Sequence, residues 1–161
     1  MESDPSPREP VDSDVDLRQS AAAAYGQGRG GEAAVLAAIA AGGAIGASAR
    51  YLVGLAWPTT SGSLPWATLA INAVGCLLIG VLMVLVSEVW IQQRLLRPFV
   101  GTGILGGFTT FSTYSVDIQQ LIADGHPGAA LTYLAATVVG ALAAVWAATR
   151  TTRALVNRSR R

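Results

Sequence analysis

The sequence predicts an all-α membrane protein with four transmembrane helices, the third of them broken near the midplane of the bilayer. The 161-residue chain has a mean hydropathy of +0.45, and 13% of its residues are charged. Soluble domains carry about 25% charged residues. Four apolar segments approach the roughly 20 residues that cross about 30 Å of hydrocarbon, and glycine and hydroxyl residues interrupt one of them.

The predicted organisation is a membrane domain between two polar ends. Residues 1–32 contain seven of the ten acidic residues and few large apolar ones, which favours a disordered N-terminal tail. Residues 33–149 are expected to form the four-span domain. Residues 150–161 contain five of the eleven arginines and are expected to be a basic C-terminal tail.

Short connections separate the four predicted spans. These run from Ala33 to Trp57, from Trp66 to Ser87, from Pro98 to about Ala123, and from Gly128 to Thr149. Tryptophan side chains favour the membrane–water interfaces. The four tryptophans of the chain lie at or near span ends, at Trp57, Trp66, Trp90 and Trp146. Their positions support the expected boundaries.

Small residues recur at four-residue spacing in two spans, at Ala38, Gly42 and Gly46 in the first and at Gly103 and Gly107 in the third. This spacing lets the backbones of membrane helices approach closely. Four such helices enclose little volume, so we expect the chain to form an oligomer.

The third span contains a poor helix interior. Gly106 and Gly107 lose backbone entropy in a helix, and the nearby Thr109 and Thr110 suit an N-cap. We therefore expect an interruption. The exposed carbonyls of a broken membrane helix can bind a cation, and the restarted helix points its positive N-terminus toward an anion. A kink that serves only packing is the alternative.

Aromatic and hydroxyl side chains follow the expected break. Phe111 and Tyr114 share one helix face, and Ser112 and Ser115 form a second pair beside them. Aromatic rings have a positive edge. Ring edges and hydroxyls without a basic residue can accompany a small anion without trapping it, as conduction requires. The alternative is an ordinary aromatic pair in a packed core.

Other polar residues within the spans have two possible roles each. The Asn72 amide can donate hydrogen bonds to an anion or join two helices. Tyr133 and Thr137 lie four residues apart and form a polar stripe on the fourth span. Arg50, near the outer end of the first span, can attract anions into a vestibule or extend its charge to the membrane surface.

The arginines predict the orientation of the chain. With an even number of spans, both termini and the loop between spans two and three lie on one side. That side receives Arg29, Arg94, Arg97, Arg150, Arg153, Arg158, Arg160 and Arg161, and the opposite loops receive none. By the positive-inside rule, we expect both termini in the cytoplasm of a cell whose inner (plasma) membrane holds the chain.

Several function classes are excluded by what the sequence lacks. It contains no nucleotide-binding, GxSxG or HExxH motif, so an enzyme is not expected, and its net charge of +1 gives no reason to expect nucleic-acid binding. The single cysteine, Cys76, cannot form an intramolecular disulfide and is expected to be a small buried apolar residue. His126 is expected to be an exposed loop residue.

The polar residues and their spacing resemble the CrcB/Fluc family of fluoride channels. The matching segments are GGAIGASARY, INAVG, GTGILGGFTTFSTYS and YLAAT, one from each span. The resemblance implies a four-helix subunit that assembles as an antiparallel, dual-topology dimer. It also implies two pores at the subunit interface and a structural sodium ion (Na+) at the centre of the dimer.

The resemblance also implies roles for individual residues. The backbone carbonyls of Gly106 and Thr109 would bind Na+, and Phe111 and Tyr114 would form an aromatic box along the fluoride path. The remaining pore positions would be Asn72, Ser112, Thr113, Tyr133 and Thr137, with Arg50 and Asp117 in the vestibule. Two positions depart from the family pattern: Tyr114 stands where phenylalanine is common, and Asp117 where glutamate is common.

The expected function is a fluoride-selective passive channel that exports F⁻ from the cytoplasm and so relieves fluoride toxicity. One alternative is a non-conducting or partly degenerate subunit of a heteromeric fluoride channel. Another is a small multidrug-type transporter, which would require a glutamate within the first span that this chain lacks. The partner of the antiparallel dimer is either a second copy or, as the arginine bias favours, an oppositely biased homologue.

Overall fold

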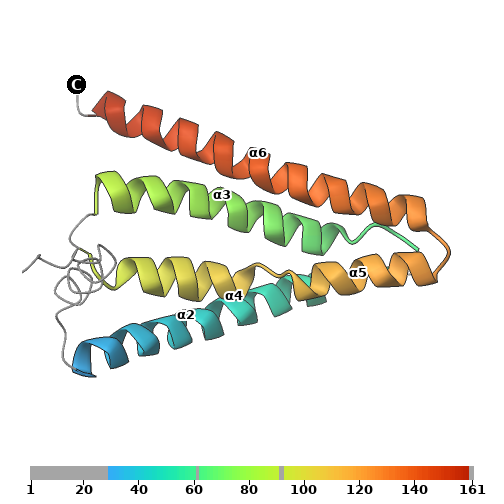
Figure 1. Ribbon diagram of the computed structural model, residues 1–161, viewed down its shortest axis with the longest axis horizontal. Helices are drawn as coiled ribbons and strands as arrows, with labels where there is room; N and C mark the ends of the chain where they lie inside the picture. Colours follow the sequence, from blue (N-terminus) through green and yellow to red (C-terminus); the bar gives the residue numbers. More distant parts are fainter. Residues whose placement is uncertain (1–28, 61, 91–92, 160–161) are drawn as a thin grey trace, which may run out of the picture. The chain divides into compact units, whose positions relative to one another are not determined.

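A computed structural model describes residues 29–60, 62–90 and 93–159 of the chain. Most of the predicted N-terminal tail, residues 1–32, lies outside these ranges. The chain divides into two units, Met1–Ala33 and Ala34–Arg161, and the second contains the features that follow apart from the first residues of one helix. Among the described residues every regular element is helical, which confirms the all-α class (Figure 1).

Three helices are long and apolar enough to cross a membrane. They are α2 (Arg29–Ala56), α3 (Trp66–Glu88) and α6 (Pro127–Ser159). The predicted second span agrees with α3 to within one residue. Helix α2 begins four residues before the predicted first span, and α6 continues ten residues beyond Thr149, through the segment expected to be a basic tail.

The predicted third span consists of separate helical pieces. A π-helix, η1 (Arg97–Leu105), continues directly into the short α4 (Gly106–Phe108), and α5 (Ser112–Ala123) follows after an interruption. At Thr109 the backbone is extended, with φ −74° and ψ 158°. Figure 1 shows the two halves in one line with an unwound connection between them. The predicted break is therefore confirmed.

Helix α6 packs along α3 and also contacts α5. A buried cluster of Tyr114, Leu121, Ala130 and Tyr133 joins α5 to α6. Further along, a Cβ atom placed on Gly80 would lie 2.9 Å from the Cβ of Ala148, so α3 and α6 approach closely there as well. The two helices thus support α5, which carries three of the seven predicted pore residues, Ser112, Thr113 and Tyr114.

Glycines bring α2 against the first half of the broken segment. A Cβ atom on Gly103 would lie 2.9 Å from the Cα of Gly42, and one on Gly107 would lie 2.5 Å from the carbonyl oxygen of Gly43. A Cβ atom on Gly46 would collide with the Ile104 carbonyl oxygen. The prediction of close backbone approach at these glycines is confirmed.

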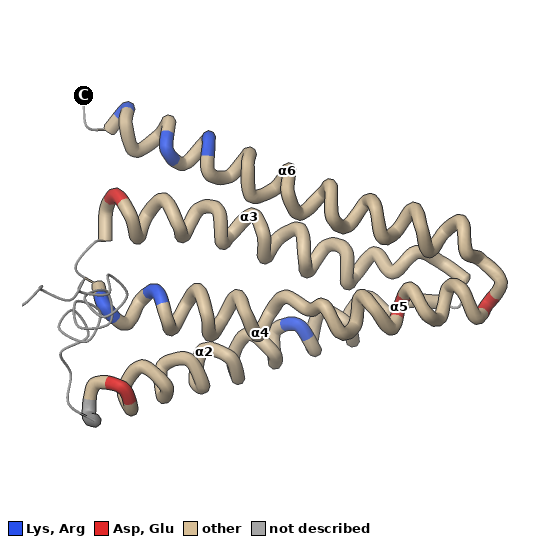
Figure 2. Tube along the Cα trace, viewed as in Figure 1, with Lys and Arg blue, Asp and Glu red and all other residues tan. Residues whose placement is uncertain are grey.

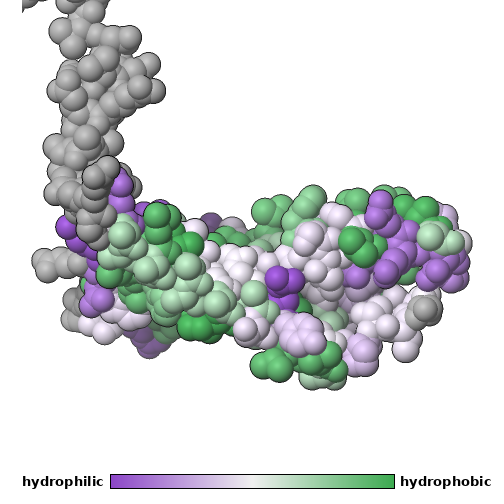
Figure 3. All heavy atoms as spheres, turned by 90° about the horizontal axis from the view of Figure 1, so that it is seen from below, coloured by the Kyte–Doolittle hydropathy of each residue, from purple (hydrophilic) through white to green (hydrophobic). Residues whose placement is uncertain are grey.

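Large apolar side chains are exposed along the helices, as Figure 3 shows for one face. The tryptophans expected at interfaces are among them: Trp57, Trp66, Trp90 and Trp146. Exposed apolar faces of this extent mark surfaces that contact lipid or another protein. His126 is exposed in its loop, as expected.

Candidate functional site

The peptide groups at the break are bound by a side chain of α3. The Asn72 Nδ2 donates a hydrogen bond of 2.9 Å to the carbonyl oxygen of Thr110, and the Thr110 N–H donates one of 2.9 Å to Asn72 Oδ1. Backbone groups that leave a helix at membrane depth need substitute partners. The Asn72 amide supplies both for this residue.

A threonine caps the restarted helix from one residue before the N-cap position, which Phe111 occupies. The N–H of Thr113 donates to the Thr110 hydroxyl oxygen at 3.1 Å, and the same hydroxyl donates to the Thr113 Oγ1 at 3.0 Å. A side-chain oxygen that accepts a bond from an early N–H is the typical N-cap arrangement. Before the break, the Thr109 hydroxyl donates to the carbonyl oxygen of Leu105 at 3.0 Å and so stays on its own helix.

These bonds remove the regular helical donors of two carbonyl oxygens, those of Gly106 and Thr109. In a regular helix the N–H of Thr110 would donate to Gly106, and that of Thr113 to Thr109. Both N–H groups donate elsewhere, to Asn72 and to the Thr110 hydroxyl. The carbonyl oxygens of Gly106 and Thr109 have therefore lost their regular helical donors, which leaves them able to bind a cation.

Arg50 extends from α2 to the break. Its Nε donates a hydrogen bond of 3.1 Å to the carbonyl oxygen of Gly107. A positive side chain at the C-terminal end of a helix compensates the partial negative charge of the last carbonyls. Sequence reasoning considered Arg50 only as a vestibule or surface residue and did not foresee this contact, because its partner lies 57 residues away.

Five of the seven predicted pore residues line two cavities that share Thr110, and Ser112 and Tyr133 line neither. The first, the Phe111 cavity, has a volume of about 460 Å³. Its lining includes Asn72, Gly106, Thr109, Phe111, Tyr114 and Thr137. The second, the Arg50 cavity, has a volume of about 390 Å³. Its lining includes Arg50, Thr68, Thr113 and Asp117. The half-buried Cys76 lines the Phe111 cavity rather than lying fully within a core.

Three aromatic rings form a row from α5 to α6. The ring centres of Phe111 and Tyr114 are 5.8 Å apart, and those of Tyr114 and Tyr133 are 5.4 Å apart, with tilts of 52° and 50°. Phe111 is 79% exposed and Tyr114 only 8%. The Tyr114 hydroxyl donates to the carbonyl oxygen of Leu134 at 3.3 Å, so this phenol is held by α6.

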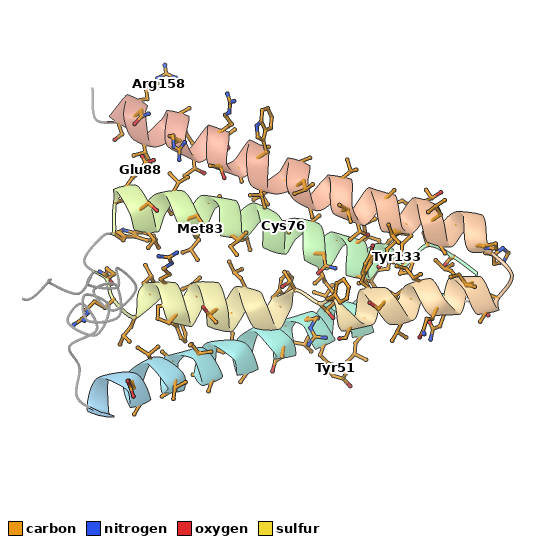
Figure 4. All side chains as sticks on the ribbon, in the orientation of Figure 1. Tyr51, Cys76, Met83, Glu88, Tyr133 and Arg158 are labelled. Atoms are coloured by element: carbon orange, nitrogen blue, oxygen red, sulfur yellow. The ribbon has the colours of Figure 1, made fainter. Side chains whose placement is uncertain are left out.

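Several predicted pore hydroxyls already donate within the protein. The Tyr133 hydroxyl donates to Asp117 Oδ2 at 3.1 Å, and the Thr137 hydroxyl donates to the Tyr133 carbonyl oxygen at 2.8 Å. Figure 4 shows Tyr133 among the side chains between α5 and α6. The oxygens of Ser112 and Thr110 lie 3.3 Å apart at the start of α5. An anion would have to compete for the Tyr133 and Thr137 hydrogens.

Thr110 was not among the residues predicted to form the site, although it contacts Asn72 and lines both cavities. Its N-cap propensity was the available signal. Thr68, which is buried and lines the Arg50 cavity, had no signal beyond its position one turn before Asn72.

Residues 37–149 match the protein family described as "CrcB-like protein, Camphor Resistance (CrcB)". The chain belongs to the CrcB/FluC family. The resemblance of its four segments to that family is therefore confirmed. Since three of its helices are long and apolar enough to span a bilayer, this CrcB protein is a multi-pass membrane protein.

Curated relatives of this CrcB chain are named as ion channels. "Fluoride-specific ion channel FluC 2" of Streptomyces avermitilis is 60% identical over 108 residues, which cover 67% of this chain and 68% of the relative. "Fluoride-specific ion channel FluC 1" of Streptomyces coelicolor is 57% identical, covering 73% and 76%. "Fluoride-specific ion channel FluC 2" of Nocardia farcinica is 53% identical, covering 80% and 91%.

Proposed function

We propose that this CrcB chain is a subunit of a fluoride-specific ion channel that lets F⁻ leave the cytoplasm passively. The observation that carries the proposal is the interrupted third segment, whose peptide groups are bound by Asn72 and which is followed directly by the Phe111–Tyr114 pair. The names of relatives up to 60% identical support the choice of ion.

Passive conduction is sufficient for export. The weak acid HF crosses membranes in acidic surroundings and dissociates in the cytoplasm, so fluoride accumulates there as an anion. A negative interior potential drives an anion outward with about 2.3 kcal/mol per 100 mV. A channel that provides a selective path therefore relieves fluoride toxicity without an energy source of its own.

In the proposed path, fluoride moves between the Arg50 cavity and the Phe111 cavity. Arg50 attracts the anion, and the ring edges of Phe111 and Tyr114 accompany it. Asn72 uses one Nδ2 hydrogen for the Thr110 carbonyl, so its second hydrogen is the one that faces fluoride. The hydroxyls of Ser112, Thr113, Tyr133 and Thr137 complete the polar positions, and Asp117 orients the Tyr133 hydroxyl.

The proposed channel is an antiparallel dimer. Phe111 is 79% exposed in the single chain, and the Phe111 cavity is lined by α3, by the interrupted segment from η1 to α5, and by α6. A second subunit would cover the exposed ring and enclose the path. Four membrane spans in each chain, with the interrupted segment as the third, fit this arrangement.

A structural Na+ at the centre of the dimer is also proposed. The carbonyl oxygens of Gly106 and Thr109 fit this role because their regular helical donors bind elsewhere. Two chains would supply four such oxygens, and hard cations prefer oxygen ligands. The ion would hold the two interrupted helices together at the point where each is weakest.

We propose further that the partner is an oppositely biased homologue. Arginines of the described residues gather at the C-terminal end of α6 and around the start of η1 (Figure 2), an asymmetry that favours insertion with both termini in the cytoplasm. Streptomyces avermitilis has relatives named FluC 2 and FluC 3, so one organism can hold several such chains. A conducting heteromer and a heteromer in which this chain is non-conducting are the two forms to distinguish.

Fluoride efflux from liposomes tests the proposal. The chain is reconstituted alone and together with a homologue of opposite arginine bias, and F⁻ release is followed with an electrode. Rapid F⁻ release without Cl⁻ release is expected for the pair, and slow release for the chain alone. Absence of F⁻ release from both preparations would contradict channel function, whereas equal rates would contradict only the heteromer.

Two variants locate the path. Phe111→Ala is expected to reduce F⁻ efflux by at least about tenfold, which corresponds to ~1.4 kcal/mol in the barrier. Asn72→Asp places a negative charge beside the anion and is expected to abolish efflux. Leu142→Ala, which truncates a side chain that is 68% exposed and also lines the Phe111 cavity, is the matched control and should retain most of the rate.

A further inference from the structure

Helix α6 is longer than a membrane span. Its 33 residues extend about 50 Å, whereas the hydrocarbon core is about 30 Å thick. The predicted fourth span ended at Thr149, and the helix continues to Ser159. The last turns of α6 therefore lie in the headgroup region or in water.

One face of α6 changes from apolar to basic at the end of the predicted span. At about 100° per residue, six exposed residues fall within a sector of about 100°. They are Leu131, Val139, Leu142, Trp146, Arg150 and Arg153. The first four are 62–68% exposed and apolar or aromatic, and the last two are basic. This order of apolar, aromatic and then basic residues suits a helix that leaves the hydrocarbon and enters the headgroup layer.

Trp146 and Arg150 form a pair at the transition. The guanidinium carbon of Arg150 lies 5.2 Å from the centre of the Trp146 ring, within the range of a cation–π interaction. Tryptophan side chains favour the level of the headgroups. Arg150 is thus held at the depth where lipid phosphates lie.

Arg153 is fixed on the same face. Its Nε donates to Glu88 Oε1 at 3.1 Å, and its side chain is 60% exposed. That bond uses one of the five N–H donors of a guanidinium. Glu88 lies at the end of α3, beside the C-terminal part of α6 (Figure 4). The close packing of Gly80 on Ala148 holds the preceding turns of α6 on α3, so this face has a defined position.

We propose that the face formed by Trp146, Arg150 and Arg153 binds the headgroup phosphate of an anionic phospholipid. Residues three apart on a helix are neighbours, with about 5–6 Å between their Cβ atoms, so both guanidinium groups can contact one phosphate. Planar guanidinium groups suit bidentate phosphate binding. The apolar residues from Leu131 to Trp146 lie below them, where the acyl chains of the same lipid would pack.

The charge of this region favours an anionic lipid over a zwitterionic one. The proposed binding face carries Arg150 and Arg153, against the single carboxylate of Glu88 that contacts Arg153. Each basic residue near an anionic membrane surface contributes about fivefold to binding, the equivalent of ~1 kcal/mol. A zwitterionic headgroup also presents its own cation to the arginines.

Native mass spectrometry of the full-length chain tests the proposal. The protein is released from detergent in the presence of phosphatidylglycerol or phosphatidylcholine, and the retained lipid is counted. The unaltered chain is expected to retain phosphatidylglycerol preferentially. Arg150→Gln is expected to reduce its retention by about fivefold and to leave phosphatidylcholine retention unchanged. Arg150→Lys keeps the charge and is expected to retain an intermediate amount.

Arg158→Gln is the matched control, since it removes the same charge from the same end of α6 but lies about 80° or more from Arg150 around the helix axis. Its phosphatidylglycerol retention is expected to stay within about twofold of the original. Equal losses in both variants would overturn the proposal in favour of general attraction, and equal retention of both lipids would overturn it as well. Displacement of the lipid by millimolar inorganic phosphate would also contradict it. None of these measurements depends on fluoride conduction.

Discussion

Helix α6 and the segment formed by η1, α4 and α5 both contain glycine and threonine within an apolar stretch, but only the second is interrupted. In α6 each of three threonines returns its hydroxyl hydrogen to a carbonyl of the same helix, four residues earlier. These bonds are 2.9 Å for Thr132, 2.8 Å for Thr137 and 2.7 Å for Thr149. These three hydroxyls are satisfied within α6 and need no partner from another helix.

At the interruption, the partners come from other helices. The Thr110 peptide groups bind Asn72 of α3, and the Gly107 carbonyl accepts from Arg50 of α2. The comparison indicates that hydroxyl residues alone do not break a membrane helix. The break also requires glycines that tolerate it and neighbouring side chains that replace the lost hydrogen bonds.

The largest effect is expected from Asn72→Leu. The substitution leaves the Thr110 N–H and carbonyl without their partners, at a cost of roughly 2–4 kcal/mol for two polar groups that are partly shielded from water. Thermal unfolding in detergent should show a large decrease in Tm. Fluoride efflux should be lost as well.

The matched control for Asn72→Leu is Thr149→Val on α6. It removes a hydroxyl that binds only its own helix, and the change in stability should stay below about 0.5 kcal/mol. If both variants lose the same stability, the conclusion that only the interrupted helix depends on partners from other helices is wrong.

An intermediate effect, opposite in sign between the two regions, is expected for glycine-to-alanine changes. Gly46→Ala places a Cβ atom against the Ile104 carbonyl oxygen and 2.8 Å from the Phe108 N, so α2 must move away, at about 1–3 kcal/mol. Gly140→Ala on α6 meets no atom within 4 Å and should stabilise the helix by up to about 1 kcal/mol. Tm values of the two variants, measured side by side, would contradict this if they shifted in the same direction.

The smallest effect is expected from Tyr114→Phe, which removes only the phenolic hydroxyl. The lost bond to the Leu134 carbonyl is long, at 3.3 Å, and should contribute at most about 1 kcal/mol. Because α6 holds the phenol, fluoride efflux should change by less than about twofold, the equivalent of ~0.4 kcal/mol in the barrier. A much larger change in efflux would indicate that the hydroxyl contacts the ion instead of the carbonyl.

The sequence predicted the features that depend on local chemistry. The pair Gly106-Gly107 followed by threonines indicated the interruption. The four-residue spacing of Gly42 and Gly46, and of Gly103 and Gly107, indicated close helix contacts. These predictions succeeded because backbone freedom and side-chain size are properties of the residues themselves.

Features that depend on tertiary contacts were not predictable. Asn72 was considered for anion binding or helix joining, but its choice of the Thr110 peptide depends on the register between α3 and α5. The extension of α6 was also missed, because hydropathy indicates which residues lie in the hydrocarbon and does not indicate where the helix ends. Ala, Arg and Leu beyond Thr149 are good helix formers in water. No residue pattern in RPFVGTGIL identified a π-helix in advance.

The double hydrogen bond at Thr110 has a consequence for permeation. Thr110 lines both cavities, and movement of its backbone would break both bonds to Asn72 at once. We therefore expect the Thr110 backbone to stay in place while an ion passes beside it, and we do not expect this backbone to open as a gate. Throughput would then be limited by how readily the ion sheds its water, and it would depend little on slow motions of the chain.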